Sequence, residues 1–308
     1  MDRLLQEPPP LPALYAKALI RPAQTALRLR KPSTALPDVR HRVENVTATP
    51  EKVAAFQGLM GRFQSQFLPS GYVHTLAFPV AVSVLARRDF PLPLLGMIHL
   101  RNEVRHLHPI AIDERLSVTA RVEKLLPHRS GTMADVVVDV EAASQLVWSG
   151  RSTYLAKGVQ AAAPGTDSSD PAVTDRTAED VPDYPTRVWT LDGGIGRSYA
   201  AVSGDYNPIH LSVASSRMLG MKRPIAHGMY LASRMVAEIG PDESSPFQWT
   251  IDFRAPVTLP SRVLLSAQVE RSSTSDWLGA EVTAWDPKRR RTHFSGRLER
   301  LHRQAGAE

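Results

Sequence analysis

Two short segments in the second half of the chain combine residue types suited to proton transfer and to carbonyl polarisation. In Ser203-Gly-Asp-Tyr-Asn-Pro-Ile-His210, an acid, an amide and an imidazole fall within six positions. Free Asp and His have pKa values of about 3.9 and 6.5, so at neutral pH the acid is charged and the imidazole is largely a neutral base. Such a pair, converging on one water, can take up a proton and return it elsewhere, which is worth about two to four decades in rate.

The second segment, Pro224-Ile-Ala-His-Gly-Met229, opens an apolar helix. The N-terminus of a helix carries unpaired backbone N–H groups and a partial positive charge. Glycine at this position lets a carbonyl approach the backbone closely. We therefore predict an oxyanion site at Gly228 for a thioester or similar carbonyl. Pro208 suits the first position of a further helix through 211–219, with His210 in its first turn. Asn207 is suited to cap this helix or to close the preceding turn.

Together the two segments resemble the hydratase-2 motif of MaoC-like dehydratases and (R)-specific enoyl-CoA hydratases, Ser-Gly-Asp-x-Asn-Pro-x-His followed by Pro-Ile-x-His-Gly-Met. Every fixed position of both segments is present in this chain. The resemblance implies a hotdog fold, in which a curved antiparallel sheet wraps a long central helix. A chain of this length resembles the double-hotdog branch, where the dimer is fused into one polypeptide, and the actinobacterial 3-hydroxyacyl-thioester dehydratases within it. The strong match covers 185–301.

The resemblance also implies a role for each motif residue. Asp205 and His210 would hold the catalytic water and move its protons, and Asn207 would orient the pair. Gly228 would donate its N–H to the thioester oxygen as water adds at C3 of a trans-2-enoyl thioester, or leaves an (R)-3-hydroxyacyl thioester. Which of the acid and the imidazole contacts the C2 proton stays open. The predicted substrate-binding residues are Ser203, Tyr206, Pro208, His227 and Met229.

One departure from the family pattern is visible. Family members often carry an acid two residues after the motif histidine, whereas this chain has Ser212. We interpret this as a change at the edge of the site that leaves the chemistry intact.

The elements that must position these residues occur twice. In the first half, the apolar run 76–86 precedes strand-like runs at 97–105, 115–125, 133–140 and 145–157. In the second half, the apolar run 229–239 precedes 249–270, which parallels 97–123, and a closing hairpin turns at Asp286-Pro287. One helix with several antiparallel strands, present twice, predicts an α+β fold of two tandem hotdog units.

The predicted segments are a basic N-terminal arm at 1–38, a degenerate N-terminal hotdog at 39–157, a linker at 158–183, a catalytic MaoC-like hotdog at 184–303 and a tail at 304–308. Pro22 predicts two short helical pieces in the arm, packed on their own domain in preference to a membrane surface.

The first half lacks the catalytic pattern. The segment corresponding to the motif, 53–63, has neither Asp nor His, and Thr75-Leu-Ala-Phe-Pro stands in place of His-Gly-Met. We therefore expect one active site per chain. Leu76, Phe78 and Val80 are candidates for lining an acyl pocket, although a plain core role is favoured for residues of a central helix.

The composition of the chain excludes several classes of protein and of catalytic chemistry. The chain has no cysteine, which excludes disulfide scaffolding, thiolate catalysis and cysteine-bound zinc. The N-terminus lacks the pattern of a signal peptide, and no apolar run approaches a membrane span, so a soluble cytoplasmic protein is expected. A formal charge of +6 suits polyanionic partners such as nucleic acid, anionic lipid, the phosphates of coenzyme A or an acidic carrier protein, and by itself does not choose among them. Neither a metal nor a cofactor is expected.

Three other patterns have simpler explanations. His99, His106 and His108 lack neighbouring acids at metal-ligand spacing and are interpreted as surface or satisfied histidines. The glycines of 192–197 predict a turn into a helix, since no βαβ context supports a phosphate loop. The basic run 288–291 falls at a hairpin turn without interleaved aromatic residues, so nucleic acid is not an expected partner.

Two other function classes stay open beside the hydro-lyase. A hotdog thioesterase usually needs a carboxylate on its central helix, and the only acid on the second-half helix is Glu238, near its end. A non-catalytic acyl-thioester-binding module is the other alternative, since the first half already lacks catalytic residues. The expected substrate is an acyl-CoA or an acyl carrier protein thioester, and a homodimer of double-hotdog chains is the assembly considered.

Overall fold

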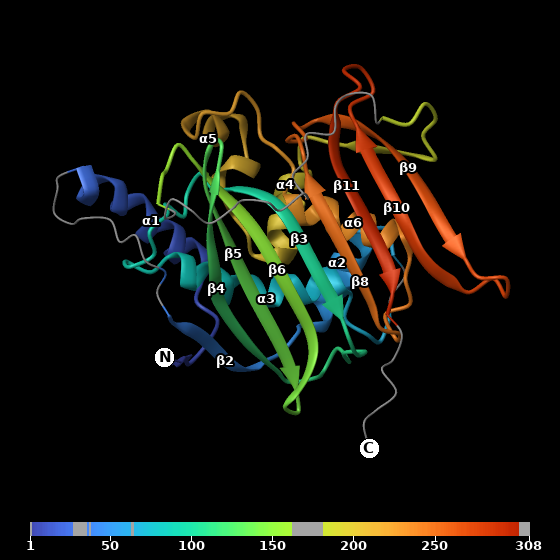
Figure 1. Ribbon diagram of the computed structural model, residues 1–308, viewed down its shortest axis with the longest axis horizontal. Helices are drawn as coiled ribbons and strands as arrows, with labels where there is room; N and C mark the ends of the chain where they lie inside the picture. The colour runs from blue at the N-terminus through green and yellow to red at the C-terminus, as the bar shows by residue number, and fades with distance from the viewer. Residues whose placement is uncertain (1, 27–35, 37, 63–64, 162–180, 302–308) are drawn as a thin grey trace.

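The computed structural model describes residues 2–26, 36, 38–62, 65–161 and 181–301. Within these residues, eleven strands form one curved sheet in the order β1-β2-β4-β5-β6-β3-β8-β11-β10-β9-β7 (Figure 1). In chain order the elements are β1 (Asp2–Leu5), α1 (Leu11–Ala26), β2 (Arg40–Val46), α2 (Pro50–Leu59), α3 (Ser70–Leu85), β3 (Ile98–His106), β4 (Leu116–His128), β5 (Gly131–Ala142), β6 (Gln145–Lys157), β7 (Arg187–Leu191), α4 (Ile195–Ser203), η3 (Pro208–His210), α5 (Val213–Met218), α6 (Gly228–Ile239), β8 (Phe247–Phe253), β9 (Ser261–Arg271), β10 (Trp277–Trp285) and β11 (Thr292–Arg300).

The sheet consists of two copies of one strand arrangement. The first half runs β2-β4-β5-β6-β3 and the second half runs β7-β9-β10-β11-β8, so the strands correspond one to one. The copies join edge to edge through the antiparallel pair β3 and β8, where Arg101 also forms a salt bridge with Asp252 at 3.1 Å. This architecture confirms the predicted double hotdog.

The long helices α3 and α6 lie together on one face of the sheet (Figure 1). A Cβ atom at Gly71 would overlap the side chain of Ser233, so glycine allows the two helices to approach closely where they meet. The core follows from the strand pattern. In β4, alternate residues Leu116, Val118 and Ala120 are buried, as expected when one face of a strand covers a helix.

Helix α3 begins at Ser70, six residues before the predicted apolar run, and is buried along nearly its whole length. Of the candidate pocket residues, Val80 is in the core, while Leu76 and Phe78 are partly buried. Phe78 packs against the cluster that α1 forms with α3. The four strand runs predicted in the first half correspond to β3, β4, β5 and β6.

The N-terminal arm differs from its prediction. Helix α1 continues through Pro22 as a single helix, as α3 continues through Pro79. A proline inside a helix removes one backbone hydrogen bond and bends the helix, but the helix can persist beyond that point. The first turns of α1 are anchored by Leu11, Leu14 and Tyr15, which are buried against α3. The predicted packing of the arm on its own domain is therefore what the structure shows for these residues.

Part of the predicted linker (162–180) and the predicted tail (304–308) lie outside the described residues. Across the described part of the chain, no helix combines the length and the apolar character needed to traverse a bilayer.

Candidate active site

Asp205 is positioned by the end of helix α4. The helix ends at Gly204, whose φ of 76° is the left-handed conformation that glycine adopts without strain. The Ser203 hydroxyl accepts the N–H of Asp205 at 3.2 Å, and the N–H of Asn207 donates to Asp205 Oδ1 at 3.2 Å. These local hydrogen bonds fix the carboxylate relative to the turn.

His210 lies in the short 3-10 helix η3. Asn207 caps this helix, its side-chain oxygen accepting the N–H of Ile209 at 3.3 Å. The single helix expected from Pro208 through 219 is two helices, because the chain is extended at Ser212 between η3 and α5, and α5 covers Val213–Met218 of the predicted range. Ser212 caps α5 by accepting the N–H of Ser215 at 3.1 Å. The residue that departs from the family pattern thus starts a new helix beside the site.

Two contacts orient the His210 ring and backbone. Nδ1 donates to the carbonyl oxygen of Ile225 at 2.8 Å, which leaves Nε2 of the neutral ring as a hydrogen-bond acceptor. A Cβ atom at Gly196, in α4, would overlap the backbone carbonyl of His210. Glycine at this position therefore allows α4 to lie directly against η3.

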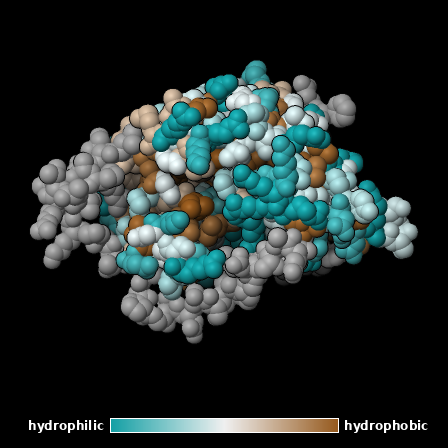
Figure 2. Space-filling view, turned by 90° about the horizontal axis from the view of Figure 1, so that it is seen from above, coloured by the Kyte–Doolittle hydropathy of each residue, from teal (hydrophilic) through white to brown (hydrophobic). Residues whose placement is uncertain are grey.

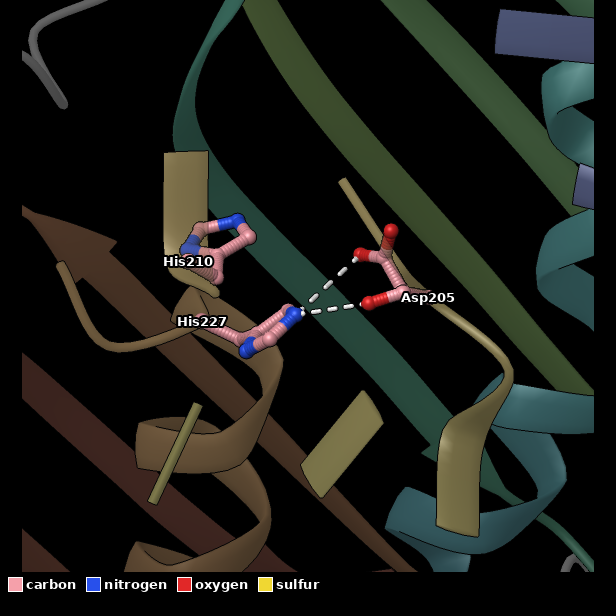
Figure 3. A group of neighbouring side chains, drawn as sticks. All are labelled: Asp205, His210 and His227. Atoms are coloured by element: carbon pink, nitrogen blue, oxygen red, sulfur yellow. Dashed lines mark hydrogen bonds and ion pairs between the residues drawn. The ribbon is translucent and has the colours of Figure 1, made fainter. Parts of the chain in front are cut away.

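His227 links the two motif segments. Its Nε2 donates to the backbone carbonyl of Asp205 at 2.9 Å and lies 3.9 Å from Asp205 Oδ2 (Figure 3). Its ring stacks on that of His210 with centroids 3.7 Å apart. Gly228, the next residue, is the first of α6, so its N–H belongs to the unpaired first turn of that helix. The ring of Phe253 lies 3.0 Å from where a Cβ of Gly228 would stand.

The histidines at the site are neutral at physiological pH. Burial, and then the neighbouring His227, lower the pKa of His210 to about 3. Burial lowers the pKa of His227 to about 4. A neutral imidazole with a free Nε2, placed beside a carboxylate, can accept a proton from a water held between them.

Asp205, His210 and His227 each place one atom, a carboxylate oxygen or a ring nitrogen, within 4.8 Å of the other two. At that separation, Asp205 and His210 can both reach one water with hydrogen bonds of about 2.8 Å. The same three groups could also face a metal ion. However, His227 Nε2 is engaged with the Asp205 carbonyl, and His210 Nδ1 with that of Ile225. The absence of a metal thus stays a prediction, and a bound water is the occupant we favour.

The first half also contributes side chains to this region. The Tyr15 hydroxyl, from α1, donates to Asp205 Oδ1 at 2.7 Å. On the joined sheet, His99 stacks with Tyr154 at 4.5 Å and contacts Phe253 at 5.0 Å between ring centroids. Burial, and then the nearby His74, lower the pKa of His99 to about 3, so this ring is neutral. Sequence reasoning missed Tyr15 and Tyr154, and it placed His99 among the surface or satisfied histidines.

The five predicted substrate-binding residues have different surroundings. Ser203 and His227 hold the backbone of Asp205, and Pro208 begins η3. Met229 is buried in the main core, whereas the side chain of Tyr206 is 48% exposed. Of the five, Tyr206 has the most accessible side chain for a substrate.

The equivalent place in the first half, the N-terminus of α3, is filled by protein. The Ser70 hydroxyl accepts the indole N–H of Trp148 at 3.1 Å and that of Trp249 at 2.9 Å. The Ser70 N–H donates to the carboxyl group of Glu243 at 3.3 Å. An acidic side chain thus occupies the helix N-terminus that would otherwise face a substrate carbonyl, which supports the expectation of one active site per chain.

Glu243 makes stability depend on pH. Burial raises the pKa of Glu243 to about 8, whereas an unfolded Glu titrates near about 4.3. The folded state therefore keeps a proton on Glu243 that the unfolded state has lost, and the contribution of Glu243 to stability falls as pH rises from about 4.3 to about 8. The buried histidines, whose pKa values are lowered, contribute a slope of the opposite sign around their unfolded pKa of about 6.5. Because a change at Glu243 leaves these histidines in place, the difference between the wild type and a Glu243 variant isolates the contribution of Glu243.

Replacing Glu243 with Gln should remove this contribution, so the free energy of unfolding of the wild type relative to the variant should fall by up to about 1.4 kcal/mol per pH unit as pH rises from about 6.5 to about 8. The measurement is the free energy of unfolding by denaturant at several pH values from 6.5 to 8. Glu281→Gln, at an exposed position on β10, is the matched control and should retain the wild-type slope. An equal slope in the Glu243 variant and the wild type would contradict the assignment.

The chain is similar in sequence and in structure to several known proteins. The family model described as "MaoC like domain" matches residues 180–284. The chain is 30% identical over 245 residues to the 3-hydroxyacyl-thioester dehydratase X of Mycobacterium tuberculosis, covering 80% of this chain and 85% of that protein. It is 34% identical over 76 residues to the (R)-specific enoyl-CoA hydratase of Aeromonas caviae, covering 23% of this chain and 57% of that protein. The crystal structure of HtdX of Mycobacterium tuberculosis matches with a TM-score of 0.70 at 27% identity, covering 85% of this chain and 100% of that one.

Proposed function

This chain belongs to the family of MaoC-like dehydratases, and from that premise we propose that it catalyses the reversible hydration of trans-2-enoyl thioesters to (R)-3-hydroxyacyl thioesters. The observation that carries the proposal is the convergence of Asp205 and His210 beside the first turn of α6. The chain itself is thus proposed to be a hydro-lyase that needs neither metal nor cofactor.

The geometry supports a role for each group. A water held between the Asp205 carboxylate and His210 Nε2 gives up a proton as its oxygen attacks C3 of the enoyl thioester. Negative charge moves to the thioester oxygen, where the N–H of Gly228 and the positive end of α6 stabilise the enolate. A proton delivered to C2 completes the addition, and dehydration follows the same steps in reverse. His227 donates a hydrogen bond to the backbone carbonyl of Asp205 and so fixes the two motif segments, 203–210 and 224–229, relative to one another.

The thioesterase alternative would need a carboxylate able to activate water at the carbonyl carbon. Helix α3 carries no acid, and Glu238, near the end of α6, forms a salt bridge with Arg187 at 2.9 Å. The hydro-lyase is therefore better supported than the thioesterase.

The surface beside the site suits an anionic carrier. The segment between the two motif segments carries exposed Arg217, Lys222 and Arg223 and no acid from Ser212 to Arg223. Met218, in the same segment, is 87% exposed. From the side on which α5 lies, apolar residues gather in a hollow bordered by hydrophilic ones (Figure 2). The phosphates of coenzyme A and an acidic acyl carrier protein would both find complementary charge here. Homodimer formation and a cytoplasmic location stay predictions.

The direct test is an assay of purified protein with trans-2-enoyl-CoA substrates of increasing acyl length. We expect the absorbance of the conjugated thioester to fall without release of free thiol, and the product to be the (R)-3-hydroxyacyl thioester. A chelator such as EDTA should leave the rate unchanged. Thiol release without hydration would favour the thioesterase, and binding without any reaction would favour the non-catalytic module.

A further inference from the structure

A side chain from the N-terminal arm reaches the proposed active site. The hydroxyl of Tyr15, on the second turn of α1, donates to Asp205 Oδ1 at 2.7 Å, across 190 positions of sequence. That oxygen also accepts the N–H of Asn207 at 3.2 Å. One carboxylate oxygen is thus held by two protein donors, while Oδ2 is the oxygen on the side of His227, 3.9 Å from its Nε2.

The packing of α1 fixes where this hydroxyl lies. Leu11, Leu14 and Tyr15 are buried and form a separate apolar cluster with Val82 of α3, joined by partly buried Phe78. Tyr15 itself is 8% exposed. A buried ring with neighbours on its own helix and on α3 has few alternative rotamers, so its hydroxyl meets the carboxylate in one geometry.

In the hydrogen bond between Tyr15 and Asp205, the tyrosine hydroxyl is always the donor. Burial, and then the charge of Asp205, raise the pKa of Tyr15 well above its usual range, so the hydroxyl keeps its proton at every pH of enzyme activity. A hydrogen bond to an ionised group is stronger than one between neutral groups. The donor therefore stabilises the ionised carboxylate and restrains its rotation.

We propose that Tyr15 is a positioning residue of this active site, which holds Asp205 Oδ1 so that Oδ2 is directed at the catalytic water, and that helix α1 is part of the catalytic unit. The inference rests on the proposed hydration activity. Because Tyr15 acts through Asp205, its loss should reduce turnover while substrate affinity is retained.

The test removes one oxygen atom. Tyr15→Phe preserves the ring and its packing, and should lower kcat about tenfold to a hundredfold, with KM changed less than about threefold. Tyr184→Phe removes the same atom at a side chain that is 85% exposed, and should leave both constants unchanged. The acidic limb of the kcat profile should move to higher pH in the Tyr15 variant, because the ionised carboxylate has lost a donor. The titratable groups that face Asp205 are Tyr15, Tyr154, Tyr199, His210 and His227.

A thermal unfolding cycle tests the contact independently of activity. Tyr15→Phe should lower the Tm of the wild type more than that of Asp205→Ala, where the hydroxyl already lacks its acceptor. Equal losses in both backgrounds, an unchanged kcat, or a kcat that rises because the arm obstructs the site, would each overturn the proposal. If the wild type hydrates no enoyl thioester, the proposed function fails, and the unfolding cycle still decides whether the Tyr15 contact exists.

Discussion

Replacing Asp205 with Asn, or His210 with Ala, should lower kcat for enoyl-thioester hydration by about 10²- to 10⁴-fold in each case. Both changes remove a group that holds the water or moves its proton, and a single general acid or base is worth about that factor. KM should change much less, because neither group is proposed to bind the acyl chain. Initial rates followed by loss of the conjugated thioester absorbance give both constants.

The double variant should be scarcely slower than the worse of the two single variants. Asp205 and His210 are proposed to act on one water, and groups that act as a unit are strongly non-additive. Asp276→Asn, at an exposed position between β9 and β10, is the matched control and should keep full activity. If both single variants hydrated substrate at the wild-type rate, the assignment of this site would be wrong even though the protein is active.

Replacing Gly196 with Ala should also reduce kcat strongly, by about a hundredfold, although Gly196 has no role in the chemistry. The added methyl group would overlap the backbone carbonyl of His210, so η3 must move away from α4. A displacement of about 1 Å in a catalytic group costs roughly a hundredfold in rate. Stability should fall as well, because the displaced segment carries the His210 contact with Ile225.

The matched control is Gly193→Ala, three residues earlier, in the turn before α4. A Cβ at Gly193 would meet nothing within 4 Å, so this substitution should leave kcat and Tm near the wild-type values. Steady-state kinetics with thermal unfolding of both variants give the comparison. Equal effects of the two substitutions would show that the close approach of Gly196 to His210 does not position the imidazole.

Much of the fold could be predicted from the sequence because its signals are local. The apolar helix runs and the strand runs recur in the same order in both halves, and the structure has corresponding strands in each. The turn that carries Asp205 was also predictable, since its contacts join residues only a few positions apart. The break at Ser212 had a local signal too, because serine is a favoured helix cap, but the motif proline suggested one continuous helix.

Other features of the structure could not be predicted from patterns in the sequence. The contacts by which the first turns of α1 pack on α3 join distant parts of the chain. The filling of the N-terminus of α3 likewise depends on Glu243, which lies 173 positions from Ser70. Neither produces a periodicity or a motif in the segment concerned. Their free energies arise from contacts between distant parts of the chain.

By itself the sequence determined the double hotdog, the family and the two segments that carry the proposed chemistry, because residue types at fixed short spacings constrain the backbone locally. Only the tertiary structure decided that His227 holds the Asp205 carbonyl and that Tyr15 reaches the same residue from the arm. The reason is physical: a hydrogen bond across 190 positions forms only when the whole core has packed and brought α1 against α3.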